Sequence, residues 1–165
     1  MKGVEKIAQK TTEKGRFLEE ETYESLAGVY GNEYDVDDVR NAVGAVPHSK
    51  LGDYVLRCPA YKIAIDTTEE ALSESDARKK VEGAMRNREA DGAVLVFRSF
   101  DLIPNKKMMV KVGYNKFFAY FGSHREGTWD IAIDVLIALV EAQKRADERV
   151  EVNIAAQVES RVDKI

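Results

Sequence analysis

The stretch "KIAIDTTEE", residues 62–70, begins with a run typical of an apolar strand. An acidic residue, Asp66, follows this run, and two threonines come directly after it. Short runs rich in isoleucine and other apolar residues are typical of buried strands. An aspartate that ends such a strand is often turn or cap chemistry, and in other proteins it belongs to a functional site. The neighbouring segments decide between these alternatives, because they determine what else lies at the same edge of the sheet.

The segment before this strand, "DYVLRC" at residues 53–58, also favours a strand, and Pro59 separates the two. We expect the pair to form an antiparallel hairpin. Asp53 stands at the start of the first strand and Asp66 at the end of the second. An antiparallel hairpin would therefore bring both carboxylates to one end, where two acids can share a divalent metal ion.

The segments after the strand predict a helix and then a buried strand. Residues 73–92 have candidate caps at Ser73 or Ser75, apolar residues at steps of four, and Gly92 at the end, which predicts a surface helix over residues 75–90. "GAVLVF", residues 92–97, is a continuous apolar run typical of a strand covered on both faces. Two more strands are expected at residues 108–112 and 117–121. This order is typical of a mixed α/β domain with a crossover helix.

Helices are expected at both ends of the chain. Residues 4–29 carry small and apolar residues at alternating steps of four and three, as one helical face does. From Thr128 an apolar stretch gives way to a polar one, which predicts a half-buried helix that runs out of the globule. A seam near the end follows steps of three, four and three, and indicates either a dimer contact or the stub of a longer chain; it consists of Ala155, Val158, Val162 and Ile165.

Composition limits the classes of function. The 165 residues are 44% apolar and 33% charged, which is enough for one packed core with helical extensions. The formal net charge of -4 excludes a global cationic field, so any anionic partner must meet a local patch. No apolar run is long enough to span a membrane, and a cytoplasmic location is expected. Cys58 is the single cysteine, which excludes an internal disulfide and a thiolate zinc cluster.

Four segments, taken in chain order, resemble the PD-(D/E)XK nuclease superfamily, and are most similar to its coiled-coil-associated branch of RmuC-type DNA recombination proteins. They are "KGRFLEEETYESL" at 14–26, "PHSKLGDYVLRC" at 47–58, the strand end "IAID" at 63–66, and "READGAVLVF" at 88–97. The resemblance implies a restriction-endonuclease-like mixed sheet flanked by helices, with a long C-terminal helical extension. It divides the chain into a helical extension at 1–13, a core domain at 14–140, and a helical or coiled-coil extension at 141–165.

The resemblance also implies a catalytic set. Glu19 matches the helix glutamate of the family, Asp53 the first metal aspartate, and Asp66 the acid of the acid-x-lysine triplet. These three acids would hold Mg²⁺. The place of the family's lysine is taken by Thr68, whose neutral hydroxyl cannot neutralise charge that develops on a phosphate. Activity is therefore expected to be impaired, with Lys80 or Lys62 as a poor substitute for the missing cation.

Other lysines could stand near the acids. Lys79 and Lys80 both lie on the expected crossover helix, and Lys62 lies on the strand of Asp66 but roughly 13 Å from it at about 3.3 Å per residue. The alternative for "ARKK", residues 77–80, is a solvated helix face.

A DNA-binding surface is expected in residues 105–121, where lysines alternate with aromatic residues that can clamp phosphates and stack on bases. The alternative is an edge strand with the rings in the core and lysines in solvent. The sequence thus predicts a metal-dependent deoxyribonuclease, or else a catalytically inactive DNA-binding or assembly module that forms a homodimer through its helical ends. The DNA-contacting candidates are Lys106, Lys107, Lys111, Lys116 and Arg125.

Overall fold

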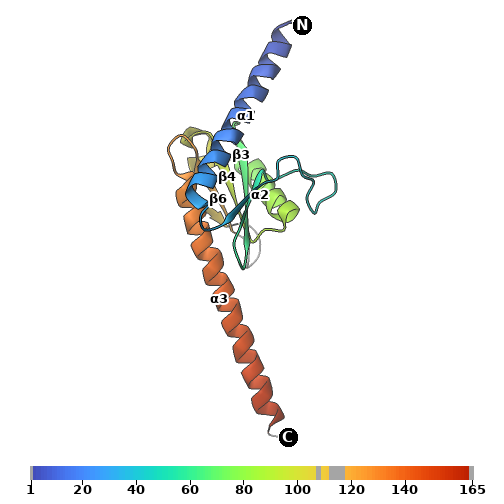
Figure 1. Cartoon of the computed structure of the whole chain (residues 1–165), viewed down its shortest axis with the longest axis vertical. Coiled ribbons are helices and arrows are strands. Elements are labelled where there is room, and N and C mark those ends of the chain that lie inside the picture. The colour runs from blue at the N-terminus through green and yellow to red at the C-terminus, as the bar shows by residue number, and fades with distance from the viewer. Residues whose placement is uncertain (1, 107–108, 112–117, 164–165) are drawn as a thin grey trace.

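In the described part of the chain, one mixed sheet of six strands organises the fold, in the order β1-β2-β3-β4-β6-β5 (Figure 1). The computed structural model describes the backbone of residues 2–106, 109–111 and 118–163, and the side chains of residues 16–106 and 122–163. The strands are β1 (Asp35–Asp38), β2 (Tyr54–Arg57), β3 (Lys62–Thr68), β4 (Gly92–Phe97), β5 (Met109–Lys111) and β6 (Phe118–Ser123). The first three strands pair antiparallel, β3–β4 and β4–β6 pair parallel, and β5–β6 pair antiparallel.

Among the described residues, three α-helices flank the sheet: α1 (Lys2–Tyr30), α2 (Glu74–Arg88) and α3 (Trp129–Val162). α2 is the crossover between the parallel strands β3 and β4, as predicted. It begins after Ser73, whose hydroxyl accepts a hydrogen bond from the backbone N–H of Asp76 at 3.1 Å. It ends at Glu89, which adopts the left-handed conformation with φ of 51°. Of the two caps that the sequence offered, Ser73 is therefore the one used.

The side chains of the central strands alternate between two apolar cores. Ile63 and Ile65 of β3 pack with Val94 and with α1 and α3 on one face of the sheet. Ala64 packs with Leu95 and α2 on the other face. Asp66 is two residues beyond Ala64, so its side chain lies on the α2 face. All six residues of β4 are buried, which confirms the prediction of a strand covered on both faces.

The two terminal helices leave the globule in opposite directions (Figure 1). α3 buries apolar side chains over its first turns, from Trp129 to Val140, and the side chains beyond residue 147 are exposed as far as they are described. The prediction of a half-buried helix that runs out of the globule is thus confirmed. The expected boundaries at 13/14 and 140/141 both fall within continuous helices. The division into three domains stays a prediction.

α1 uses a somewhat different face from the expected one. Leu18 and Thr22 are buried as predicted, but the burial continues through Leu26 and Tyr30, and Val29 is 56% exposed. A row of residues spaced four apart winds slowly around an α-helix. The buried face of α1 therefore curves with the surface of the globule instead of running parallel to the helix axis. The hairpin β2–β3 is confirmed. β1 was missed, since "DVDD" is too polar to predict a strand. None of the helices in the described part of the chain has the length and apolar content needed to cross a membrane.

Candidate functional site

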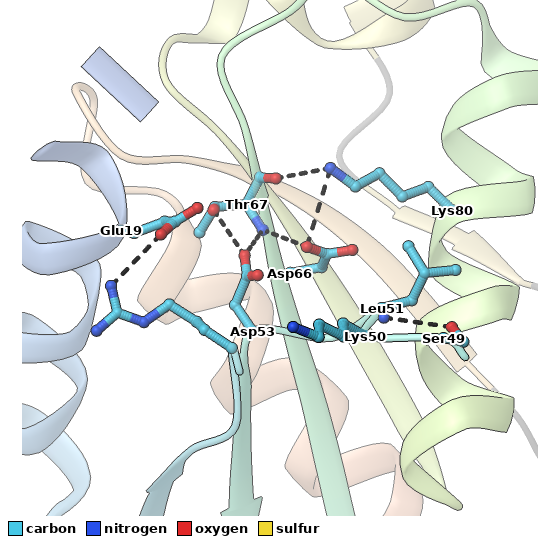
Figure 2. Close-up of a pocket in the computed structure, with 9 residues that line it drawn as sticks. Glu19, Ser49, Lys50, Leu51, Asp53, Asp66, Thr67 and Lys80 are labelled. Carbon is cyan, nitrogen blue, oxygen red and sulfur yellow. Dashed lines mark hydrogen bonds and ion pairs between the residues drawn. The ribbon is translucent and has the colours of Figure 1, made fainter. Parts of the chain in front are cut away.

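The open end of the β2–β3 hairpin brings Asp53 and Asp66 together. Tyr54 pairs with Ile65, and the backbone N–H of Asp53 donates to the Ile65 carbonyl at 2.8 Å. The two carboxylates converge on a single donor, the backbone N–H of Thr67, which is 2.8 Å from Asp53 Oδ2 and 3.0 Å from Asp66 Oδ1 (Figure 2). The Thr67 hydroxyl adds a hydrogen bond of 2.7 Å to Asp53 Oδ2. The predicted meeting of the two aspartates is therefore confirmed.

Asp66 is held where a carboxylate is poorly solvated. Its side chain is almost fully buried, and its Oδ2 atom has no hydrogen-bond partner. Burial raises the pKa of Asp66 well above its ordinary value, and the neighbouring carboxylate of Asp53 raises it further. The ammonium group of Lys80 lowers the pKa in part. A buried acceptor without a partner beside a second acid is an unsatisfied arrangement that a bound cation would satisfy.

The structure places one of the candidate lysines at the acids. Lys80 extends from α2, and its Nζ atom donates to the Thr67 carbonyl at 2.8 Å and lies 3.9 Å from Asp66 Oδ1 (Figure 2). Lys79 is exposed on the neighbouring position of the helix. Lys62 lies at the opposite end of β3, where its backbone N–H bonds Asp91. Of the three candidate lysines, Lys80 is thus the one that the fold brings to the acids.

Thr68 does not line the cavity, although it takes the place of the lysine in the acid-x-lysine triplet that the sequence resembles. Its hydroxyl accepts a hydrogen bond from the backbone N–H of Glu70 at 3.2 Å, as in a turn after a strand. Thr67 lines the cavity instead. The Thr67 backbone N–H joins the two acids. The catalytic position of Thr68 that the resemblance implies stays a prediction.

Glu19 lines the same cavity from α1 but faces a cation. Its Oε2 atom is 3.4 Å from Arg40 Nη1, and the Tyr54 hydroxyl donates to the Glu19 carbonyl, which fixes this turn of α1 against the sheet. Burial raises the pKa of Glu19, and the charge of Asp53 raises it too. Arg40 was not expected in the site. An ion pair with Asp38 holds Arg40, with Asp38 Oδ2 2.6 Å from Arg40 Nη2. The Arg40 guanidinium also lies 5.6 Å from the centroid of the Tyr54 ring.

Two residues near the C-terminal end of α2 hold the loop between β1 and β2 over the site. Asn87 donates to the carbonyls of Ser49 at 3.1 Å and Leu51 at 2.8 Å. Arg88 donates to the carbonyls of Gly52, Val39 and Lys50 at 3.0, 2.8 and 3.1 Å, respectively. Both side chains are buried. The sequence held one signal for them: Arg88 continues the apolar helical face of Ala77, Val81 and Ala84, where a polar residue needs partners.

Gly52 allows this loop to approach α2. Its φ is +87°, and a Cβ atom added there would lie 2.8 Å from Arg88 Cγ. We expect Gly52→Ala to lower the free energy of unfolding by about 1–3 kcal/mol, because a left-handed backbone and a clash combine. Urea unfolding followed by circular dichroism measures this. The matched control is Gly28→Ala in α1, where a Cβ meets nothing within 4 Å and a gain of up to about 1 kcal/mol is expected. Equal effects at both positions would contradict the strain at Gly52.

The assembled site is an open cavity of about 490 Å³. It is lined by Glu19, Arg40, Ser49, Lys50, Leu51, Asp53, Asp66, Thr67 and Lys80. Among residues 16–106 and 122–163, no three His, Cys, Asp or Glu side chains stand close enough together to hold a metal ion. Two carboxylates are nevertheless sufficient for Mg²⁺, which keeps waters and substrate phosphate as its other ligands. The Asp53–Asp66 pair, with one buried oxygen unpartnered, fits such an ion.

The predicted DNA-contacting lysines are only partly described. Lys107 and Lys116 lie outside the described residues, as does the side chain of Lys111. Lys106 is exposed, with Nζ 5.8 Å from the Phe100 ring centroid. Arg125 is exposed just beyond β6, at the sheet edge where the parallel strands end. Asp66 stands near the same edge.

The fold and the site together define a mixed α/β protein that carries a carboxylate pair and a lysine at one edge of its sheet. Comparisons of the chain with protein-family models, with curated proteins and with solved structures gave no match. The chemistry of the site itself therefore carries the functional argument.

Proposed function

We propose that this protein is a metal-dependent nuclease that hydrolyses phosphodiester bonds in DNA, on a restriction-endonuclease-like fold. The observation that carries the proposal is the convergence of Asp53 and Asp66 on the Thr67 N–H, with Asp66 Oδ2 buried and unpartnered and Lys80 Nζ 3.9 Å from Asp66 Oδ1. Structural acids at a strand end are ordinarily solvated or fully hydrogen-bonded. A buried, incompletely bonded carboxylate beside a second acid and a lysine is the arrangement expected of a functional site.

The order of elements supports the proposal. A helix, three antiparallel strands, a crossover helix and a parallel strand follow one another as α1, β1, β2, β3, α2 and β4. Apart from β1, which was not predicted, this is the order of helix, two strands, helix and buried strand that the resemblance to the PD-(D/E)XK superfamily implies, and the resemblance rests on motifs in α1, β2, β3 and β4. The acids of those motifs all line one cavity, although they lie up to 47 positions apart, from Glu19 to Asp66.

The residues of the site would have different roles in phosphodiester hydrolysis. Mg²⁺ bound by Asp53 and Asp66 would supply a water of lowered pKa and neutralise charge on the phosphate. Thr67 orients the two carboxylates through its backbone N–H. Lys80 places a fixed positive charge beside them, in the role of the missing motif lysine, and thereby stabilises negative charge that develops in the transition state. Its Nζ is anchored by the Thr67 carbonyl, so its position requires little reorganisation.

DNA binding is proposed to depend on cations around the cavity rather than on the chain as a whole, whose net charge is -4. Lys50 and Arg40 line the cavity on the side of the β1–β2 loop, and Arg125 stands exposed along the sheet edge. Such contacts to phosphate are sequence-independent and weaken steeply with salt. We therefore expect binding with little sequence preference.

The test is cleavage of supercoiled plasmid and linear DNA, with either Mg²⁺ or a chelator in the buffer. We expect cleavage only with the metal, and a loss of about 10²-fold in rate in Asp53→Asn. The matched control is Asp37→Asn, because Asp37 is on β1 and pairs with Arg57 outside the cavity. Cleavage that survives in Asp53→Asn, or that needs no metal, would reject this site. Binding of DNA without cleavage would favour the inactive DNA-binding alternative.

A further inference from the structure

The loop between β1 and β2 carries exposed apolar residues beside the cavity. Val43 and Val46 are 55% and 41% exposed, and Pro47 is exposed next to them. The loop, teal in Figure 1, projects from the side of the globule, and residues 49–51 further along it line the cavity. We call residues 43–48 the loop tip.

A β-turn at residues 46–49 joins the loop tip to the wall of the cavity. The backbone N–H of Ser49 donates to the Val46 carbonyl at 3.1 Å, so Pro47 is the second residue of the turn and His48 the third. Proline is favoured at the second position, and a positive φ at the third is the pattern of a type II turn, which ordinarily has glycine or asparagine there. His48 adopts this conformation with φ of 63°. Backbone strain of this kind is concentrated at functional sites.

Two consecutive residues of α2 hold the loop in one conformation. The Asn87 carbonyl accepts a hydrogen bond from the Ala45 N–H at 2.8 Å, and Asn87 Oδ1 accepts one from the Val46 N–H at 3.1 Å. Gly44 packs so closely on α2 that an added Cβ would overlap the Asn87 carbonyl oxygen. Arg88 fixes the end of the loop through three backbone carbonyls. The apolar side chains of the tip are thus exposed on an ordered backbone, which loses little conformational entropy when it binds a partner.

The residues on either side of the loop tip are suited to a phosphate backbone. Arg40 near the start of the loop and Lys50 near its end both line the cavity. A DNA strand that enters the cavity between these cations therefore passes beside the tip.

The composition of the tip selects one groove of the DNA. Among residues 43–48 only His48 has a polar side chain, so the tip cannot make the paired hydrogen bonds that distinguish bases in the major groove. Apolar side chains, proline among them, instead pack into the minor groove and between base steps. Such contacts carry little sequence information, in keeping with the weak sequence preference expected of the cavity.

We propose that the loop tip inserts into the minor groove of duplex DNA next to the phosphodiester bond in the cavity, and that the site therefore acts on duplex rather than single-stranded DNA. This inference rests on the proposed function, because the cavity is what places the strand beside the tip. A single strand has no groove and gains no contact of this kind.

Removal of the apolar side chains from the tip tests the proposal. In metal-free buffer, the double variant Val43→Ser/Val46→Ser should bind a short duplex about tenfold more weakly than wild type, and a single strand of the same length with unchanged affinity. Fluorescence anisotropy over a salt series measures both. The variant loses no charge, so the slope of log affinity against log salt concentration should stay as in wild type, whereas Lys50→Gln should reduce this slope by about one.

Inosine in place of guanine identifies the groove. The exchange removes the guanine N2 amino group from the minor groove and leaves the major-groove acceptors unchanged. Wild type should bind the inosine–cytosine duplex more tightly than the guanine–cytosine duplex, because the amino group obstructs insertion. The Val43→Ser/Val46→Ser variant should bind the two duplexes equally.

The matched control is Val150→Ser/Val158→Ser on α3, where the two valines are 56% and 55% exposed and do not line the cavity. It should bind duplex DNA like wild type. Val43→Ile/Val46→Ile keeps the tip apolar and should also retain duplex binding. Circular dichroism shows whether each variant is folded.

Four results would overturn the proposal and leave the cleavage site itself untested: a serine variant of the tip that retains duplex affinity, equal losses on duplex and single strand, an equal loss in the α3 control, or a wild type that does not distinguish inosine from guanine. A wild type that binds no duplex at all overturns it as well. A selective loss of duplex binding in a protein that does not cleave DNA would instead support the role of the loop tip and reject hydrolysis.

Discussion

An Asp66→Asn variant is expected to be more stable than wild type in metal-free buffer and yet to cleave DNA about 10³-fold more slowly. The two effects have one origin. The Asp66 carboxylate is buried, lacks a partner for Oδ2 and lies next to Asp53, so its charge destabilises the folded chain. Asparagine keeps the shape and removes the charge. It also removes the anionic ligand that Mg²⁺ needs, and thus the activity.

The pH dependence of stability provides a second measurement on the same variant. Burial and the charge of Asp53 raise the pKa of Asp66 in the folded state above its unfolded value. The folded chain then binds more protons than the unfolded chain between these two values, so stability falls as pH rises through this window. Each unit by which the pKa is raised corresponds to about 1.4 kcal/mol. Urea unfolding from pH 4 upward should therefore give a stability advantage of Asp66→Asn that widens with pH.

Magnesium should reverse the order of stability. A ligand that binds only the folded state stabilises it, so Mg²⁺ should raise the melting temperature of wild type and not of Asp66→Asn. Asp37→Asn on the half-exposed strand β1 is the control, since it removes a carboxylate outside the cavity and should leave both the metal response and the cleavage as in wild type. A variant that is less stable than wild type at neutral pH without metal would contradict the uncompensated charge at Asp66.

The meeting of Asp53 and Asp66 could be predicted from the sequence because it depends on local rules. Two strands separated by a short break pair antiparallel, and the start of one then adjoins the end of the other. The role of Thr67 could not be predicted this way. Its backbone N–H, which bonds both acids, is present in every residue other than proline, and only its hydroxyl bond to Asp53 depends on the residue type.

The contributions of Arg40, Asn87 and Arg88 depend on contacts between segments far apart in the chain. Arg88 bonds carbonyls 36 to 49 positions away, in a loop whose path the sequence does not specify. β1 was missed for a similar reason. Its four residues carry three aspartates, and it forms because its neighbour β2 offers a free edge, which outweighs the poor strand propensity of aspartate.

Lys80 provides the other large expected effect. Lys80→Met keeps the length of the side chain and removes its charge. The positive charge beside Asp66 is then lost, while the aliphatic part of the side chain is retained. We expect DNA cleavage to fall about 10²-fold to 10³-fold with little change in DNA affinity, because the interaction is proposed to matter mainly in the transition state. Single-turnover cleavage rates and binding measured without metal separate the two quantities.

The control for Lys80 is its neighbour on the helix. Lys79→Met removes the same charge from an exposed position, so a general effect of net charge on DNA binding would appear in both variants and a site-specific effect only in Lys80→Met. Lys80→Arg should recover part of the rate, since a guanidinium keeps the charge but not the compact geometry that reaches both Asp66 and the Thr67 carbonyl. Equal rates in Lys79→Met and Lys80→Met would remove Lys80 from the site. A third outcome is that cleavage is lost in Asp66→Asn but kept in Lys80→Met. The carboxylate pair would then act without a lysine, and no residue of α2 would replace the motif lysine whose place Thr68 occupies.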